Sequence, residues 1–373
     1  MKLTDISGTF GQWLSGTGPL AEVVLSSRIR LARNLAGHRF VNRCTSEEKA
    51  QILETLREVL LSIELTEERF FVEIDQASDL TRSFLVERHL ISRHHAMGKG
   101  PRGAVIAKGE YFTGMINEED HLRLQVLMSG CQLGRCAELI NQIDDMIERR
   151  VEYAFHPRFG YLTACPTNVG TGIRVSVMLH LPCLKMVGHL DRFLNAARDM
   201  NLAVRGLFGE GTEAIGDLYQ VSNQVTLGVS EQDLVRQSEQ NIIPEIVEYE
   251  NAARRKLLAD QQETIDDKIA RATALLQSAQ LVSSHEALTL LSHLRLGISM
   301  RRCLGASTPA IDRLCGLFGH DPCKDTKAIE VLNRLLLTTL PAHLQLNYGK
   351  ALETYQRDAL RAKIIRAALG GGS

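Results

Sequence analysis

A stretch of alternating polar and apolar residues begins at Glu119 and ends near Leu127. Successive side chains of a strand point to opposite faces, so this alternation predicts a β-strand with one face in a core. Glu119, His121, Arg123 and Gln125 fall together on the polar face. A carboxylate and a guanidinium on one rigid strand could present an acid–base group beside an anion clamp.

The composition is that of an ordinary folded globular chain. Of its 373 residues, 44% are hydrophobic and 23% are charged, which leaves ample apolar surface for a large core. The formal net charge of -1 argues against nucleic-acid binding by bulk charge. Met1–Leu20 lacks a signal-peptide pattern, and no apolar stretch is long enough to span a bilayer. We therefore expect a cytoplasmic protein that binds neither a membrane nor nucleic acid directly.

The cysteines bear on metal binding and on the redox compartment. Eight cysteines in a long chain without a signal segment indicate reduced thiols. A zinc site from Cys303, Cys315, His320 and Cys323 is conceivable, but their spacing fits no common zinc pattern. We therefore expect no dedicated metal site.

The first part of the chain mixes predicted strands and helices. Besides the alternating stretch, strands are predicted over 22–31, 70–74, 103–107, 174–181 and 218–227, and helices over 46–63, 133–151 and 184–200. Arg28 and Arg30 are two residues apart and therefore project from the same strand face. Thr45 or Ser46 is expected to cap the first helix.

The pattern changes near Ser230, which with Asp233 resembles a capping box that opens a long helix. Leucine-rich helices are predicted over 231–258 with a kink at Pro244, and over 264–280, 285–303, 325–339 and 353–368. The sequence therefore predicts an α+β domain over 1–230 and an all-helical domain over 231–373.

Arginines recur at strand or loop positions in four separate segments, namely at Arg28 and Arg30, Arg123, Arg174 and Arg205. The planar guanidinium forks onto phosphate oxygens, and several arginines on one sheet face would repel each other without a polyanion. Taken singly, each is better interpreted as a surface arginine.

Two glycine-containing loops, 165–174 and 205–211, accompany these arginines. Glycines let backbone N–H groups approach phosphates closely. Neither loop matches the GxxxxGK[ST] pattern of the P-loop, so each is a weak signal by itself.

Four stretches, 24–30, 117–123, 165–174 and 205–210, occur in the order found in phosphagen (guanidino) kinases, and the chain resembles that family. More narrowly, it resembles the bacterial protein-arginine kinases of the McsB type. It begins almost directly at the Ser-Ser-Arg-Ile-Arg strand, without the helical N-terminal domain of creatine and arginine kinases. It also carries a helical C-terminal region in which residues 357–362 match an RDxxRA motif.

The resemblance implies a fold and roles for individual residues. The fold would be a catalytic domain with a mainly antiparallel sheet flanked by helices, followed by a helical domain that binds phosphoarginine and supports a homodimer. The implied ATP-binding residues are Ser26, Ser27, Arg28, Ile29, Arg30, His89, Arg123, Arg174, Val175, Ser176, Val177, Met178, Arg205, Gly206, Leu207, Phe208, Gly209 and Glu210. Glu119 and Glu210 would be the catalytic carboxylates that hold the substrate guanidinium, and Cys165 would lie in the substrate loop. The implied phosphoarginine-binding residues are Arg357, Asp358, Arg361 and Ala362.

The implied activity is phosphorylation of protein arginines with ATP, with Mg²⁺ carried by the ATP phosphates and no protein metal ligand. The implied partners are protein substrates that include a heat-shock transcriptional repressor, an activator protein, and a Clp-type AAA+ protease that degrades marked proteins.

Two departures and several alternatives stay open. Phe208 stands where small-molecule guanidino kinases often have an arginine, and Met178 where they often have a histidine, which puts small-molecule activity in doubt. The alternatives are a kinase for free arginine or a relative, and a non-catalytic adaptor that reads phosphoarginine. Cys165 could position substrate or only pack in its loop. By spacing alone, Arg357 and Arg361 could be a solvated helix pair.

Overall fold

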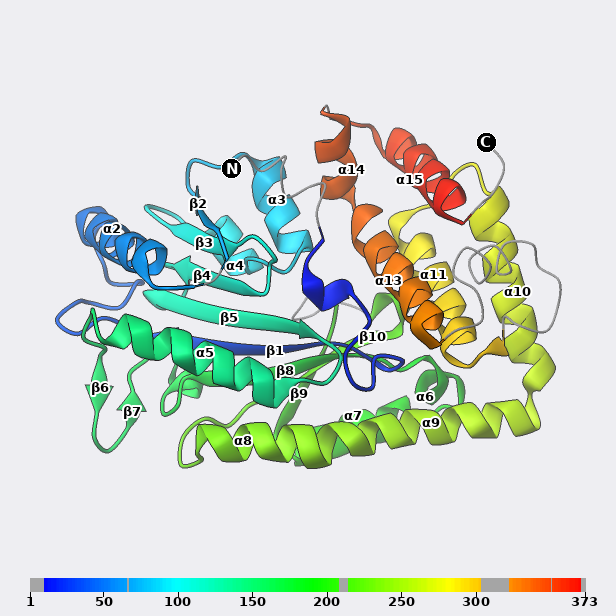
Figure 1. Ribbon diagram of the computed structural model, residues 1–373, viewed down its shortest axis with the longest axis horizontal. Coiled ribbons are helices and arrows are strands. Elements are labelled where there is room, and N and C mark those ends of the chain that lie inside the picture. The colour runs from blue at the N-terminus through cyan, green and yellow to red at the C-terminus, as the bar shows by residue number, and fades with distance from the viewer. Residues whose placement is uncertain (1–9, 66, 208–213, 303–321, 350, 370–373) are drawn as a thin grey trace.

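The computed structural model describes residues 10–65, 67–207, 214–302, 322–349 and 351–369 (Figure 1). Its main strands are β1 (Val24–Arg33), β2 (Arg69–Glu73), β3 (Gly103–Ala107), β4 (Phe112–Ile116), β5 (Leu122–Ser129), β8 (Ile173–His180), β9 (Leu202–Gly206) and β10 (Leu218–Asn223). They form one eight-stranded sheet in the order β2-β3-β4-β5-β1-β8-β10-β9, in which every neighbouring pair is antiparallel. A separate hairpin joins β6 (Phe155–His156) and β7 (Gly160–Tyr161). The predicted α+β fold with an antiparallel sheet is confirmed.

The centre of the sheet has one apolar and one polar face. Strand β1 pairs with β5 so that Arg28 lies opposite Leu127, and Arg30 opposite Gln125. Ile29 and Leu31 alternate with these arginines and are fully buried. The apolar face is covered by helices, with α5 (Leu133–Glu148) lying across β1 and β5 in Figure 1. The opposite face is therefore free to hold the arginines.

The helices of the first part largely follow the predictions. Helix α2 (Ser46–Ser62) begins after Thr45 with a capping box, in which Thr45 N donates to Glu48 Oε2 over 2.7 Å. The helix predicted over 184–200 is two helices, α6 (Pro182–Met186) and α7 (Leu190–Asp199). Gly188 separates them at a φ of 71°, a left-handed conformation that a helix interior cannot accommodate.

Several short elements were not predicted. They include α3 (Asp79–Glu87), α4 (Arg93–Met97), α14 (Pro341–Tyr348), the strands β4, β6, β7 and β9, and the 3₁₀ turns η1 (Gln12–Leu14), η2 (Pro166–Asn168) and η3 (Ile215–Asp217). Most are too short to show a clear periodicity in the sequence.

The C-terminal part is helical, as predicted. Its helices are α8 (Glu231–Gln237), α9 (Ile243–Asp260), α10 (Gln262–Ser278), α11 (Ser284–Ser299), α13 (Pro322–Thr338), α14 (Pro341–Tyr348) and α15 (Thr354–Ala368). Ser230 caps α8, since its hydroxyl accepts from Asp233 N over 3.0 Å. The kink predicted at Pro244 is a π-helical turn, η4 (Ser238–Ile242), just before that proline.

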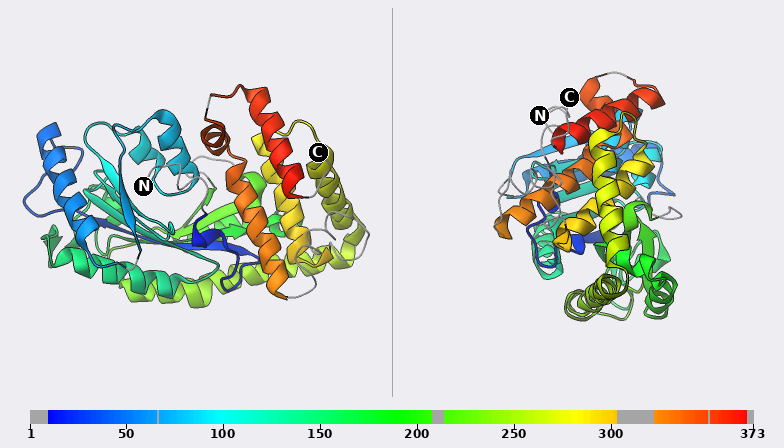
Figure 2. Two further views of the ribbon diagram at one scale, coloured as in Figure 1. Left: turned by 45° about the horizontal axis from the view of Figure 1, so that its top comes forward. Right: turned by 90° about the vertical axis from the view of Figure 1, so that its right-hand side faces the viewer.

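The packing of these helices bears on the domain division. Helices α8 and α9 run along the sheet. Helices α10, α11, α13, α14 and α15 are grouped together at one end of the sheet (Figures 1 and 2). The packing partners of the helices change near Gln261, between α9 and α10. The helical pattern begins at Ser230, and its first two helices cover the sheet; the domain boundary at 230 stays a prediction.

The later helices are fastened to the sheet-containing part by polar contacts. The Glu87 carboxylate at the end of α3 accepts from Ala342 N and His343 N at the start of α14, over 2.9 and 3.1 Å. Arg295 of α11 donates to Ala21 O over 2.6 Å. Buried donors of this kind are costly to leave unpaired, so the two parts are held in one arrangement.

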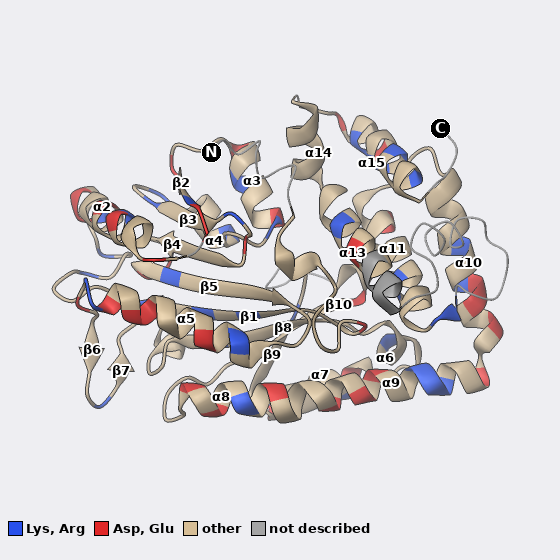
Figure 3. Cartoon of the chain, viewed as in Figure 1, with Lys and Arg blue, Asp and Glu red and all other residues tan. Residues whose placement is uncertain are grey.

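Charges of both signs are interspersed along α9 and α10 in Figure 3, as the small net charge requires. Within the described ranges, no helix combines the length and apolar character needed to cross a bilayer. No group of three His, Cys, Asp or Glu side chains suited to a metal ion occurs among the described residues. Cys303, Cys315 and His320 lie outside them.

Candidate active site

The polar face of the sheet opens into a cavity of about 760 Å³. Its walls come from β1, β5, β8 and β9, from the loop that ends in η2, and from the chain between α3 and α4. The predicted residues that line it are Arg28, Arg30, His89, Glu119, Arg123, Cys165, Arg174, Arg205 and Leu207. The structure therefore brings together all five predicted arginines, one catalytic carboxylate and the loop cysteine.

The five arginine side chains lie close together, and not every buried N–H group among them has a hydrogen-bond acceptor among the described residues. Arg28 donates to Gln220 Oε1 over 2.7 Å, and Arg174 reaches Ser222 Oγ over 3.3 Å. Arg30 Nε is buried and has no hydrogen-bond partner among the described residues. Such a buried donor in an open cavity indicates a ligand that supplies the acceptor.

Burial and mutual repulsion both act on these guanidinium groups. Burial, followed by the charges of Arg123, Arg174 and Arg205, lowers the pKa of Arg28 to about 10. The pKa of Arg30 is lowered by burial and then by the charge of Arg28. Arginine stays protonated at neutral pH, so the cavity holds concentrated positive charge. A polyanion such as a triphosphate is the ligand that relieves this repulsion.

Carboxylates stand at the β5 end of the cavity. Glu119 lies in the bend before β5 and not on the strand itself, which begins at Leu122; the predicted strand position of Glu119 is thus wrong. Its Oε2 is 3.8 Å from Arg123 Nη2, and its side chain is 38% exposed. Burial raises the pKa of Glu119 against the charge of Arg123, and Glu118 and Asp120 add to the rise. A raised pKa suits a group that must accept a proton.

Glu118 positions Arg123, a role that the sequence reasoning did not assign. Its carboxylate lies 2.5 Å from Arg123 Nη1 and accepts from Ser92 Oγ over 2.5 Å. Burial alone would raise the pKa of Glu118, but Arg123 and these hydrogen bonds hold it well below its usual range. Glu118 is therefore ionised and fixes Arg123 in place. In the sequence, the signal for this role of Glu118 was its position next to Glu119 in the acidic run 118–120.

Asp120 is a second positioning residue that sequence reasoning missed. Its Oδ1 accepts from Ala164 N and from Asn34 Nδ2, each over 2.7 Å. The carboxylate thus ties the Cys165 loop to the start of β5. Cys165 itself lies in the cavity wall, with Sγ 3.0 Å from Thr167 Oγ1. This position is compatible with both predicted alternatives, packing in the loop and contact with substrate.

His121 does not face the cavity, although the alternation predicted that it would. Leu35 N donates to its Nδ1 over 3.0 Å, and its Nε2 lies 2.7 Å from Arg39 O. Burial lowers the pKa of His121 to about 4, so the ring is neutral. It holds the chain that follows β1 against the start of β5.

A smaller apolar recess adjoins the arginines and shares Arg28, His89 and Leu207 with the larger cavity. Its lining includes the predicted residues Ser26, Ser176, Val177 and Met178, together with Trp13, which was not predicted. Trp13 packs edge-on against His89, with ring centroids 5.7 Å apart. Burial lowers the pKa of His89 to about 3, which leaves a neutral ring suited to an uncharged base. The recess is aromatic and apolar and lies beside the arginines, but its volume of about 30 Å³ is too small for an adenine ring.

Some predicted ATP-binding residues contribute no side chain to either cavity. Ser27 donates to Gly130 O over 2.7 Å, and Ile29 and Val175 belong to the buried apolar core. The reason is the strand period of two, which turns each of them away from its arginine neighbour. Gly206 ends β9 between two cavity residues. Phe208, Gly209 and Glu210 lie outside the described residues.

The C-terminal motif is arranged differently from the prediction. Arg361 is buried, and its guanidinium donates to Thr339 O, Val282 O, Ser284 Oγ and Asp358 Oδ1. Arg357 donates to Leu352 O over 2.6 Å and stays partly exposed. Ala362 is buried in the core. The shared helix face therefore does not place both arginines on one open site, since Arg361 is used to brace the helix.

Two family models match the chain. The ATP:guanido phosphotransferase C-terminal catalytic domain matches residues 51–253, and the protein-arginine kinase McsB C-terminal domain matches 262–317 and 323–372. A protein-arginine kinase from Symbiobacterium thermophilum is 40% identical over 367 residues, which cover 98% of each chain. One from Pelotomaculum thermopropionicum is 39% identical over 364 residues, or 97% of this chain and 96% of that one.

The chain belongs to the protein-arginine kinase family. It is a phosphotransferase with the ATP:guanido phosphotransferase catalytic domain. The fold agrees with a crystal structure of lombricine kinase, which has a TM-score of 0.55 at 25% identity and covers 66% of this chain and 72% of that one.

The arginine cluster generates a direct prediction. Replacing Arg174 with Ala should weaken ATP binding by about tenfold or more, the worth of a charge-assisted hydrogen bond of ~1.5–3 kcal/mol. Arg174→Lys should rescue poorly, because a point charge loses the fork geometry. Calorimetric titration with an ATP analogue measures both, with the exposed Arg192→Lys as control. Full affinity in Arg174→Lys would show that charge alone suffices.

Proposed function

We propose that this protein transfers the γ-phosphoryl group of ATP to the guanidinium of arginine residues in proteins. The observation that carries the proposal is one cavity that combines five arginines with the partly exposed carboxylate of Glu119. The arginines suit a triphosphate, and Glu119 suits a guanidinium substrate. The relatives named protein-arginine kinases support the choice of acceptor.

The phosphate end works by charge and position. Arg28, Arg30, Arg123, Arg174 and Arg205 neutralise the charge on the phosphate oxygens, and the base lies in the same large cavity, which His89 also lines. Phosphoryl transfer depends mainly on in-line positioning and electrostatic stabilisation, so a rigid sheet is a suitable support. Mg²⁺ bound to the phosphates would add to the neutralisation, and Glu118 and Glu119, the carboxylates among the described residues that line the cavity, would hold its waters.

The acceptor end must make a guanidinium into a nucleophile. With a pKa above ~12, this group is protonated and poorly nucleophilic. Glu119 hydrogen-bonds one substrate nitrogen and accepts its proton as the new N–P bond forms. The bond between the γ-phosphorus and the β,γ-bridging oxygen breaks, and ADP leaves with that electron pair. The raised pKa of Glu119 favours this proton transfer.

We extend the proposal to the cellular role. Phosphorylation would inactivate a heat-shock transcriptional repressor and would mark proteins for a Clp-type AAA+ protease, with an activator protein and a homodimer as further partners. Family membership supports this role. The free thiols of Cys44, Cys131, Cys136, Cys165 and Cys183 agree with a reducing, cytoplasmic location.

An assay for arginine-linked phosphate tests the proposed activity. The protein is incubated with ATP, Mg²⁺ and either a casein-like protein or free arginine, and acid-labile phosphate on arginine is measured by mass spectrometry. We expect phosphate on the protein substrate. Phosphate on free arginine alone would favour the small-molecule kinase, and none on either substrate would favour the adaptor.

Glu119 generates the second prediction. Glu119→Gln should keep ATP affinity and slow phosphoryl transfer by ~10²–10⁴, the usual effect of removing a positioned general base. The base must be ionised, so activity of the unaltered protein should fall as pH drops through the raised pKa of Glu119, above the ordinary Glu value of ~4.3. The pH profile of kcat/KM measures this limb.

The control for Glu119 is Glu58→Gln, on the exposed face of α2, which should change neither rate nor pH profile. Near-normal turnover in Glu119→Gln, or an acid limb that persists in its residual activity, would remove Glu119 from the role of base.

We also propose that the 357–362 segment binds phosphoarginine through Arg357 and Asp358. Arg361→Ala would remove buried hydrogen bonds and perturb the fold, so Arg357→Ala is the informative change. It should abolish calorimetric binding of a phosphoarginine peptide and leave ATP affinity unchanged. Lys363→Ala, on the exposed side of α15, is the matched control. Equal binding by both variants would make the motif structural only.

A further inference from the structure

A second cavity, of about 1180 Å³, lies between the catalytic part and the C-terminal helices. One wall is formed by α3, α4 and the turn at 98–102, and the other by the start of α11 and the start of α14. It is larger than the catalytic cavity and exceeds the ~300–1,000 Å³ of typical small-molecule sites. The activity proposed above leaves it without a role.

This groove adjoins the catalytic cavity, since Val86 and Arg93 line both. Helix α4 lies between the two and contributes to each. Arg93 and His94 near its start line the catalytic cavity, whereas Ala96 and Met97 at its end line the groove. A chain that leaves the catalytic cavity over Val86 and Arg93 would reach the groove directly.

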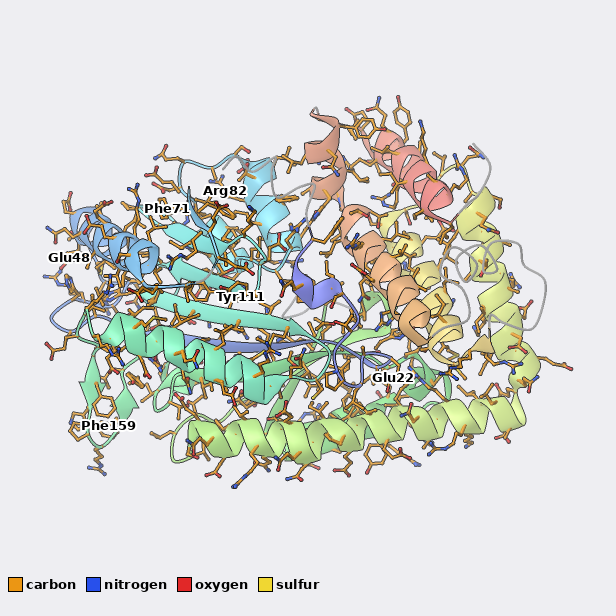
Figure 4. All side chains as sticks on the ribbon, viewed as in Figure 1. Glu22, Glu48, Phe71, Arg82, Tyr111 and Phe159 are labelled. Carbon is orange, nitrogen blue, oxygen red and sulfur yellow. The ribbon has the colours of Figure 1, made fainter. Side chains whose placement is uncertain are left out.

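The catalytic wall of the groove is preformed. The Arg102 guanidinium donates to His95 O over 2.8 Å, to Gly100 O over 3.0 Å and to Ala96 O over 3.3 Å, which fixes the turn after α4. Arg82, labelled on α3 in Figure 4, pairs with Asp79 on the same wall. Binding there would cost little ordering of the backbone.

The lining of the groove mixes apolar surface with charges of both signs. Met97 is 82% exposed, and a methionine side chain adapts to varied partners. Leu288 and Leu340 contribute apolar surface from the helical wall, and charged groups of both signs, such as Asp75 and Lys99, line the catalytic wall. A nucleotide or a lipid headgroup would favour one sign of charge. A polypeptide of varied sequence suits this mixture.

We propose that the groove binds the polypeptide of the protein substrate on one side of the arginine being phosphorylated. The proposal rests on the proposed kinase function and assigns its second binding surface. The target arginine enters the catalytic cavity, and the neighbouring chain passes Val86 and Arg93 and lies between Met97 and His285. The helical wall begins at Ser284, whose hydroxyl accepts from Arg361, so the groove also borders the 357–362 segment.

The test compares a long and a short substrate. A peptide of about 15 residues with a central arginine is long enough, at ~3.3 Å per residue, to leave the catalytic cavity, whereas a blocked arginine tripeptide is not. Met97→Asp on one wall and His285→Asp on the other should each raise KM for the long peptide by about tenfold, as for an interface anchor. The kcat for the long peptide, KM for ATP and kcat/KM for the short peptide should not change.

Met200→Asp is the matched control, because Met200 is also exposed but lies at the end of α7, outside the groove. Thermal melts establish that all three variants are folded. If Met97→Asp affects the long peptide no more than Met200→Asp does, the groove proposal is wrong. An equal loss with the short peptide would place the effect in the catalytic cavity and would also overturn it.

A binding measurement separates this proposal from the kinase proposal. Fluorescence anisotropy of the labelled peptides without ATP needs no turnover. If no arginine substrate is phosphorylated, the proposed function fails, yet the long peptide should still bind more tightly than the short one and lose this advantage in Met97→Asp. Equal affinities of wild type for the two peptides would overturn the groove whether or not the protein is a kinase.

Discussion

Repulsion between guanidinium groups on one sheet face is the interaction on which the rest of this structure depends. Arg28 and Arg30 come from β1, Arg123 from β5, Arg174 from β8 and Arg205 from β9. Among the described residues that line the cavity, Glu118 at the β5 end is the buried counter-charge. The remaining positive charge must be held by the scaffold until an anion binds, which requires apolar burial strong enough to offset it.

The opposite face of the same strands supplies that burial. Ile29 and Leu31 lie between the arginines in sequence and are fully buried beneath them. The rigidity gained in this way also serves chemistry, since in-line transfer tolerates little error in position. Glu118 and Asp120 extend the rigid part beyond the strands, because one fixes Arg123 and the other fixes the Cys165 loop. The three residues of the acidic run before β5 thus differ in environment: Glu118 and Asp120 are buried in these contacts, whereas the Glu119 side chain is partly exposed in the cavity.

The sequence predicted much of this from local patterns. The period of two placed Arg28 with Arg30, and the caps at Thr45 and Ser230 are where the residue types suggested. The periodicity of a strand or helix predicts which face a side chain lies on, but not which residues of other elements lie against that face. The alternation places His121 on the same face as Arg123, yet its ring hydrogen-bonds to the backbone of Leu35 and Arg39. The Arg361 guanidinium donates to backbone carbonyl groups of segments that are distant in the sequence. Such long-range partners, like the packing of α8 and α9 along the sheet, follow from tertiary contacts that no local spacing contains. The groove between α4 and α11 was beyond sequence reasoning for the same reason.

The central claim is that the cavity is a site for a polyphosphate held by mutually repelling arginines. The most direct measurement is the thermal unfolding midpoint with ATP, with inorganic tripolyphosphate and with adenosine, each at low and high salt. A ligand that binds only the folded state raises this midpoint by mass action. Tripolyphosphate should stabilise the protein nearly as much as ATP, salt should weaken both effects, and adenosine should do little. Stabilisation by adenosine equal to that by ATP, with none by tripolyphosphate, would contradict the account.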